Sequence, residues 1–271
     1  MVTETTDAGR LREIYDEQLR ADVPDPLPTG VTVDRDGPLL RFFGLGRRGF
    51  LTYRDLGGLD GPDLDALIAR QVQTFTERGE EVEWKLHGHD LPADLPERLR
   101  AQGFAPEEQE TVVIGPVAPL AAAQVRDIQG VRLREVSARA DLDRIATMEE
   151  EVWGDGSRDY LAASLEREKA SSGDDLLIVV AESGDLVVCA GWTRYVPGTA
   201  FATLWGGSTL PDFRGRGIYK AVVEYRARRA AERGFSLLQV DASPDSRPIL
   251  ERVGLIPVAT TTPYIFRPDA A

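Results

Sequence analysis

One stretch constrains the fold of this chain more than any other: a glycine-rich turn that joins an apolar strand to a helix. It reads Thr209-Leu-Pro-Asp-Phe-Arg-Gly-Arg-Gly-Ile-Tyr-Lys220. Residues 201–209 are apolar and β-prone, and Ile218, Val222 and Tyr225 have the spacing of one helical face. Such a turn exposes backbone N–H groups at the positive end of a helix dipole, which suits a pyrophosphate. For so short a pattern, a glycine turn that binds nothing is the alternative.

This turn resembles the acyl-CoA-binding turn of the GNAT N-acyltransferase superfamily, whose pattern is Arg/Gln-x-x-Gly-x-Gly/Ala. Arg214, Gly217 and their spacing match, and Tyr219 stands where the family has Gly or Ala. The resemblance implies acetyl-CoA or another acyl-CoA as co-substrate. The coenzyme site that it implies consists of Gly207, Ser208, Thr209, Arg214, Gly215, Arg216, Gly217, Ile218, Tyr219, Lys220 and Ser243.

The chain repeats one order of elements. At 271 residues it is longer than a typical domain and can bury two cores. In each half a long helix, a strand and a short helix follow one another, and each block ends in Gly and a large apolar residue. We expect two similar units, residues 1–118 and 131–271, joined by a linker at 119–130. The alternative is a coincidence of common α/β order.

The resemblance implies an α/β (α+β) fold, in which each unit has a mixed, mainly antiparallel sheet flanked by helices. In the C-terminal unit, the strand before the turn and the strand after the long helix are expected to splay apart and admit the pantetheine arm. Gly206 and Gly207 within the apolar strand predict a bulge or a close backbone approach, which would aim an N–H at the thioester oxygen. A simple kink is the alternative.

The first unit lacks the glycine-turn chemistry. Its counterpart, Leu56-Gly-Gly-Leu-Asp-Gly-Pro-Asp63, has two carboxylates and no arginine, and these would repel a pyrophosphate. We therefore expect a degenerate copy that packs against the second unit or shapes its substrate entrance. His87 and His89 fit a loop after a strand better than a metal site, because no further His exists and Cys189 is the one cysteine.

The usual catalytic residues of the family are missing from the matching positions. Residues 201–210 contain no Asp, Glu or His. Leu250 stands where the family places a Tyr that acts as the general acid and protonates the departing thiolate. Asp241 and Tyr264 are the candidate substitutes. The alternative for Asp241 is a helix cap, and for Tyr264 a place in the core or at its rim. Cys189 is expected in the core rather than as a nucleophile.

Three tryptophans, Trp153, Trp192 and Trp205, are candidates for an acceptor pocket, with ordinary burial as the alternative. A net charge of −13, most of it from residues 1–130, argues against a nucleic-acid partner and slightly favours a cationic acceptor. No apolar run reaches the roughly 20 residues of a membrane helix. The first seven residues have neither a basic nor an apolar region, and one cysteine suits a reducing compartment, so we expect a cytoplasmic protein.

The resemblance implies an acyl-CoA-dependent N-acyltransferase. The expected reaction transfers acetyl from acetyl-CoA directly to a primary amine of a small molecule, without a metal, a membrane or a nucleic acid. The alternative is a non-catalytic acyl-CoA sensor or scaffold protein, which Leu250 and the missing strand carboxylate favour.

Overall fold

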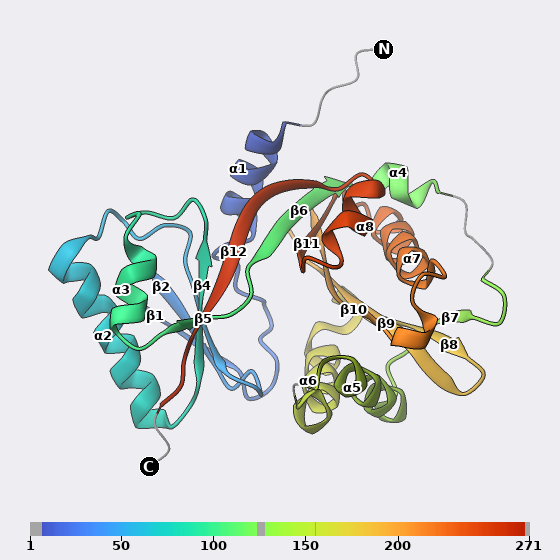
Figure 1. Cartoon of the computed structure of the whole chain (residues 1–271), viewed down its shortest axis with the longest axis horizontal. Helices are drawn as coiled ribbons and strands as arrows, with labels where there is room; N and C mark the ends of the chain where they lie inside the picture. Colours follow the sequence, from blue (N-terminus) through green and yellow to red (C-terminus); the bar gives the residue numbers. More distant parts are fainter. Residues whose placement is uncertain (1–6, 124–127, 155, 269–271) are drawn as a thin grey trace.

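The computed structural model of the chain describes residues 7–123, 128–154 and 156–268. It shows one continuous, mainly antiparallel open sheet flanked by helices (Figure 1). Eleven of the twelve strands follow the order β1-β2-β3-β4-β12-β6-β11-β10-β9-β8-β7, and the twelfth, β5, pairs with β12 outside this path. The predicted mixed α/β fold class is confirmed.

The N-terminal half has the order of elements that its sequence pattern predicts. The elements are α1 (Ala8–Gln18), β1 (Thr32–Asp36), β2 (Leu39–Phe43), β3 (Gly49–Thr52), α2 (Gly61–Arg78), β4 (Val82–His87), α3 (Leu95–Ala101), β5 (Ala105–Pro106) and β6 (Glu110–Pro116). Helix α2 has Pro62 in its first turn and ends at Gly79, whose φ of 61° terminates the helix in the left-handed region. Its buried face includes Leu64, Ile68 and Phe75.

The C-terminal half contains the glycine-rich turn. Its elements are α4 (Val117–Ala121), β7 (Arg132–Glu135), α5 (Arg139–Trp153), α6 (Ser157–Ser172), η1 (Gly173–Asp175), β8 (Leu176–Ser183), β9 (Leu186–Tyr195), β10 (Phe201–Thr209), η2 (Pro211–Phe213), α7 (Ile218–Glu232), β11 (Leu237–Ala242), α8 (Arg247–Arg252) and β12 (Ile256–Phe266). Strands β8 and β9 form an antiparallel hairpin.

Both halves contain the same parallel crossover. Strand β3 pairs in parallel with β4 across α2, and β10 pairs in parallel with β11 across α7. The last strand of each half then lies against the other half: β6 pairs with β11, and β12 pairs with β4 (Figure 1). Strands β6 and β12 also pair with each other, so the sheet runs without interruption through both halves.

The expected domain boundary stays a prediction. Helix α4 occupies the start of the proposed 119–130 linker, and residues 124–127 of that linker lie outside the described part of the chain. The strand exchange means that each half completes the sheet of the other. No helix in the described ranges is long and apolar enough to cross a membrane.

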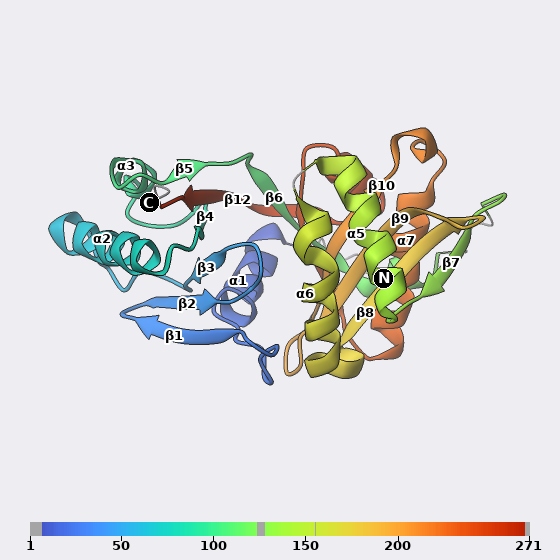
Figure 2. The same cartoon turned by 90° about the horizontal axis from the view of Figure 1, so that it is seen from below.

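Helices cover both faces of the sheet in each half. In the N-terminal half, α2 and α3 pack with Trp84 and Leu86 of β4. Because side chains alternate along a strand, Glu83, Lys85 and His87 face the other side, where α1 lies. Figure 2 shows α5 and α6 on one side of the C-terminal part of the sheet, with α7 behind it. One face of the sheet is therefore bounded by α1 at one end and by α6 at the other.

Candidate active site

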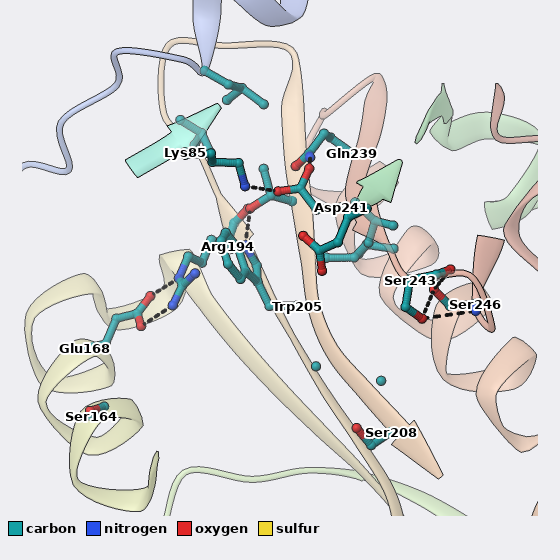
Figure 3. A pocket seen from close by; sticks show the side chains of 18 of the residues that line it. Lys85, Ser164, Glu168, Arg194, Trp205, Ser208, Gln239, Asp241, Ser243 and Ser246 are labelled. Atoms are coloured by element: carbon teal, nitrogen blue, oxygen red, sulfur yellow. Dashed lines mark hydrogen bonds and ion pairs between the residues drawn. The ribbon is translucent and has the colours of Figure 1, made fainter. Parts of the chain in front are cut away.

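A cavity of about 1390 Å³ lies on this face and is lined by both halves. The N-terminal half contributes α1, β4 and β6, and the C-terminal half contributes α6, β10, β11 and the glycine-rich turn. Figure 3 shows Lys85 of β4 pointing toward Asp241 of β11, with Arg194, Trp205 and Glu168 grouped nearby. Strands β4 and β11, which carry Lys85 and Asp241, come from different halves and are brought close by the strand exchange.

The glycine-rich turn forms one end of this cavity. Gly215 and Gly217 have φ values of 74° and 80°, and Gly217 caps α7. Among the described residues, the backbone N–H groups of 215–220 find no acceptor, whereas that of Ala221 donates to the Gly217 carbonyl at 3.0 Å. The first turn of α7 contains no acidic residue. These free donors and the helix dipole fit a pyrophosphate.

Two arginines of the turn, Arg214 and Arg216, donate to backbone carbonyls and hold the turn in place. The Arg214 Nε donates to the carbonyl of Thr209 at 3.1 Å, and an Arg216 amino group donates to the carbonyl of Gln129 at 3.2 Å. The Arg216 guanidinium also lies over the Phe213 ring. The cavity is lined by ten of the eleven predicted coenzyme residues, and Arg216 is the one outside it.

Strands β10 and β11 separate beside the turn. Their parallel pairing is limited to Phe201–Thr203 with Leu237–Gln239, although β10 continues to Thr209 and β11 to Ala242. The expected splayed pair is therefore confirmed. Beyond Thr203 the facing backbone edges are open toward the cavity, as an extended ligand arm laid between strands requires.

The predicted bulge is present at the end of β10. The register with β9 shifts between Gly206 and Ser208, and Gly207 is the extra residue with a φ of 97°. A Cβ at Gly207 would lie 2.6 Å from the Tyr219 ring. The large side chain at the position where the GNAT pattern has Gly or Ala is therefore accommodated by a missing side chain on the facing strand.

Two further contacts hold this region. The buried Arg226 of α7 donates to the carbonyls of Trp192 and Trp205 at 3.1 and 3.0 Å, which ties β9 to β10 next to the bulge. Burial raises the pKa of Tyr219, and the Ser246 side chain counteracts this only slightly. Ser243 accepts the Ser246 N–H at 3.3 Å and thereby starts the turn into α8.

The floor of the cavity is formed by Glu83 and Lys85 of β4, Glu110 of β6 and Asp241 of β11. It thus has three carboxylates and one lysine. Lys85 forms an ion pair with Asp241, whose other oxygen accepts a hydrogen bond from Gln239 at 2.8 Å. Burial is the largest single influence on the pKa of Lys85 and lowers it, but Asp241, Tyr15 and Glu83 together outweigh burial, so the pKa is raised and Lys85 stays charged. Asp241 is thus engaged across the two halves rather than in a helix cap.

Glu110 is the second carboxylate of this floor. Burial, reinforced by the Asp241 charge, raises the pKa of Glu110 to about 7. Burial also raises the pKa of Glu83, which lines the same cavity. Unlike that of Asp241, the Glu110 side chain has neither a hydrogen bond nor an ion pair with any described residue.

Two of the three predicted tryptophans line the cavity. Trp153 is exposed, and its Nε1 donates to Ser208 Oγ at 2.7 Å, while Ser208 donates to Glu149 at 2.7 Å. Trp205 is also exposed, and the Arg194 guanidinium lies 4.2 Å above its ring. Trp192 is instead packed in the core with α5 and α6, which corrects its prediction as a pocket residue.

Comparisons with known proteins agree with this geometry. Residues 140–254 match the family described as the acetyltransferase (GNAT) family. The C-terminal half carries a GNAT domain. No curated protein matches the sequence.

Solved structures with little sequence identity share the fold over nearly the whole chain. A GCN5-related N-acetyltransferase from Kribbella flavida superposes with a TM-score of 0.66 at 15% identity, over 96% of this chain and 95% of that one. A GCN5-related N-acetyltransferase from Sphaerobacter thermophilus gives 0.61 at 14%, over 97% and 92%. A tandem GNAT protein from the clavulanic acid biosynthesis pathway gives 0.61 at 12%, over 90% and 86%.

GNAT proteins use acyl-CoA. In this GNAT domain the position of the family's general-acid Tyr departs from the usual pattern. Leu250 stands at that position and is fully buried in the core beneath α7. Tyr264 does not replace this Tyr. The Tyr264 side chain lies on the face of β12 that points away from the cavity, where it is buried with α2 and α3 beneath Arg100. The prediction of Tyr264 as a catalytic residue is therefore corrected. Cys189 is buried, as expected for a core residue, and burial raises its pKa to about 11.

The sequence interpretation missed the contribution of the N-terminal half to the cavity. Glu83, Lys85 and His87 alternate with the buried Trp84 and Leu86 along β4. This alternation was the available signal, since a strand with charged residues at every second position has a polar face. Glu110 gives no such signal, because only the strand exchange places it beside Asp241.

Proposed function

We propose that the chain is an acyl-CoA-dependent N-acyltransferase that transfers acetyl from acetyl-CoA directly to a primary amine of a small molecule. The observation that carries this proposal is a single cavity that joins the free N–H groups of the turn to an acidic floor. The GNAT family match supports N-acyl transfer as the class of reaction.

The residues divide into those that hold the donor and those that meet the acceptor. The N–H groups of 215–220 bind the pyrophosphate, and the open edges of β10 and β11 beyond Thr203 hold the pantetheine arm. The bulge at Gly207 places backbone N–H groups near the carbonyl that is attacked. The carboxylates of the floor favour an acceptor that arrives as a cation.

Asp241 has a positioning role in this proposal. Its two oxygens are bound by Lys85 and Gln239, so it is poorly placed to take a proton from an amine. It keeps β4 and β11 together at the floor and adds negative charge beside Glu110.

The test is release of free thiol from acetyl-CoA in the presence of spermidine, kanamycin, L-lysine and a protein N-terminal peptide. We expect turnover with at least one of these amines and none without protein. Acetyl-CoA binding with no thiol release across the panel would contradict the proposal. That result would favour the sensor or scaffold, which the buried Leu250 also favours.

A further inference from the structure

The cavity contains an unpaired carboxylate that belongs to the N-terminal half. We propose that Glu110 of β6 is the general base that takes the proton from the acceptor amine. This inference rests on the proposed function and adds that the N-terminal half supplies a catalytic residue to the GNAT domain.

The register of the sheet places Glu110 on the cavity face. Val112 of β6 lies opposite Asp241 of β11, and residues two apart on a strand face the same side. Glu110 is therefore the diagonal neighbour of Asp241, at a distance of about 7 Å between such positions. On its other side Glu110 lies opposite Thr261 of β12, which in turn lies opposite His87 of β4.

The neighbours of Glu110 are a specific set of charges. The groups around it on the cavity side are Asp241 from β11, Glu83, Lys85 and His87 from β4, and Tyr15 from α1. Glu108, which precedes β6 and does not line the cavity, adds only the weakest of the charge effects on Glu110. The Lys85 charge is engaged by Asp241. The His87 Nε2 bonds to the Tyr15 hydroxyl at 2.9 Å, and burial keeps the pKa of His87 well below its usual range. Neither His87 nor Tyr15 therefore supplies Glu110 with a cation.

A base suited to neutral pH needs an unpaired acceptor atom and a proton affinity matched to that pH. Glu110 is half-buried, lines the cavity and has no hydrogen-bond partner among the described residues. Its pKa of about 7, raised by burial and by Asp241, lets it hold and release a proton near neutrality. Asp241 has its oxygens occupied, and Glu168 is paired with Arg194. Glu83 lies on β4, two strands further than β6 from the open edge of β11.

The position also faces the reacting end of the proposed coenzyme path. Pairing between β10 and β11 ends at Gln239, and Asp241 is two residues further on the open side. Glu110 lies one strand beyond Asp241, on the cavity face. An amine between this floor and the open edge of β10 thus has the donor path on one side and Glu110 on the other.

The protons and electrons balance as follows. An ammonium acceptor gives one proton to the Glu110 carboxylate, and the freed nitrogen lone pair attacks the thioester carbonyl carbon. The C–N bond forms and the C–S bond breaks, with its electron pair on sulfur. The nitrogen loses its second proton, which neutralises the thiolate as free thiol, and Glu110 returns its proton to water.

The first test measures turnover by Glu110→Gln, with Glu110→Asp as the conservative variant and Glu108→Gln as the control. Glu108 is an exposed neighbour that does not line the cavity. With the fastest amine of the panel, we expect Glu110→Gln to lower kcat/KM about 100-fold. Acetyl-CoA affinity should be unchanged, and Glu110→Asp should recover part of the rate. Glu108→Gln removes only a weak charge effect on Glu110 and should retain most of the wild-type rate.

The pH profile distinguishes a base from a structural residue. In wild type, kcat/KM should rise as pH increases through about 7, because the raised pKa keeps Glu110 protonated below it. Glu110→Gln should lose this limb and keep only the titration of the amine itself. Infrared spectroscopy should also find a protonated carboxyl band that disappears near pH 7 in wild type and is missing from Glu110→Gln.

The outcomes separate the two proposals. Thiol release by wild type with an equal rate and pH profile in Glu110→Gln would overturn the role of Glu110 and leave the proposed function intact. Acetyl-CoA binding with no thiol release by wild type would overturn the proposed function, and the assignment of Glu110 as base with it. A carboxyl band that titrates near pH 4 would contradict the inference independently of turnover.

Discussion

The two halves of the molecule share one crossover and differ in what surrounds it. In the C-terminal half, β10, the glycine-rich turn and α7 open onto the cavity, and the first turn of α7 has no acidic residue. In the N-terminal half, β3, the 56–63 segment and α2 have the same order, but Asp63 lies in the first turn of α2. None of residues 56–63 lines the cavity.

The difference shows how two similar units divide one task. The C-terminal crossover has the free N–H groups that suit an anion, whereas the N-terminal half places β4 and β6 under the same cavity. Because β6 pairs with β11 and β12 pairs with β4, the floor of the cavity is built by both halves together. We propose that the N-terminal copy has lost coenzyme binding and shapes the acceptor side.

The largest expected effect comes from changing the turn itself. Arg216→Ala combined with Gly217→Asp puts a carboxylate among the free N–H groups and removes one cation. We expect acetyl-CoA affinity to fall on the order of 100-fold, about 2.7 kcal/mol. Isothermal titration calorimetry measures this.

The matched control lies in the other half. Gly58 has a φ of 77°, close to the 80° of Gly217, and open space at its Cβ position. Gly58→Asp should therefore impose similar backbone strain and leave acetyl-CoA affinity unchanged. A comparable loss from Gly58→Asp would show that the N-terminal turn takes part in binding, and the comparison between the halves would break.

Arg226→Leu should destabilise the C-terminal half. It leaves the carbonyls of Trp192 and Trp205 without their donor in a buried site. We expect a loss of about 2–4 kcal/mol in the free energy of unfolding, measured by urea denaturation. Arg229→Leu, on the exposed side of the same helix, should cost much less. Equal losses would mean that the bulge does not depend on Arg226.

Gly207→Ala tests how the domain tolerates Tyr219. The added Cβ meets the Tyr219 ring and occupies a left-handed backbone, so we expect about 1–3 kcal/mol of destabilisation. Gly215→Ala has a similar positive φ but open space, and it reports the backbone strain alone. Tyr219→Ala should restore part of the stability lost in Gly207→Ala. Identical losses at the two glycines would rule out the steric contact.

The smallest effects sharpen the role of the shared floor. Lys85→Met should raise the pKa of Glu110, because the Lys85 charge lowers it, and Asp241→Asn should lower the same pKa. Each shift should be up to about one unit in the infrared titration of the carboxyl band. The midpoint should move to higher pH in Lys85→Met and to lower pH in Asp241→Asn. Shifts in the same direction would contradict the placement of Glu110 between these charges.

Much of the fold was predictable because local signals agree with the global structure. The glycine-rich turn, the bulge at Gly206 and Gly207, and the hairpin of β8 and β9 follow from glycine positions and apolar periodicity. Helix α2 likewise begins near Pro62 and ends at Gly79, as its pattern predicts. These features depend on neighbours in the sequence, which a pattern can report.

The rest depends on contacts between segments far apart in the chain. The strand exchange pairs Asp241 with Val112 and Tyr264 with Trp84, and no local signal specifies either register. The exchange explains why Tyr264 faces the N-terminal core rather than the cavity. It also explains why Glu110, which the sequence interpretation passed over, lies closer to the proposed chemistry than the predicted Tyr264.

The central claim is that one half binds the coenzyme and the other supplies the base. The most direct measurement is a crystal structure of the whole chain with a non-hydrolysable thioether analogue of acetyl-CoA. The account predicts the pyrophosphate on the N–H groups of 215–220, the arm between β10 and β11, and the acyl end facing Glu110 across the space for an amine. A pyrophosphate at 56–63, or an acyl end directed away from Glu110, would contradict it.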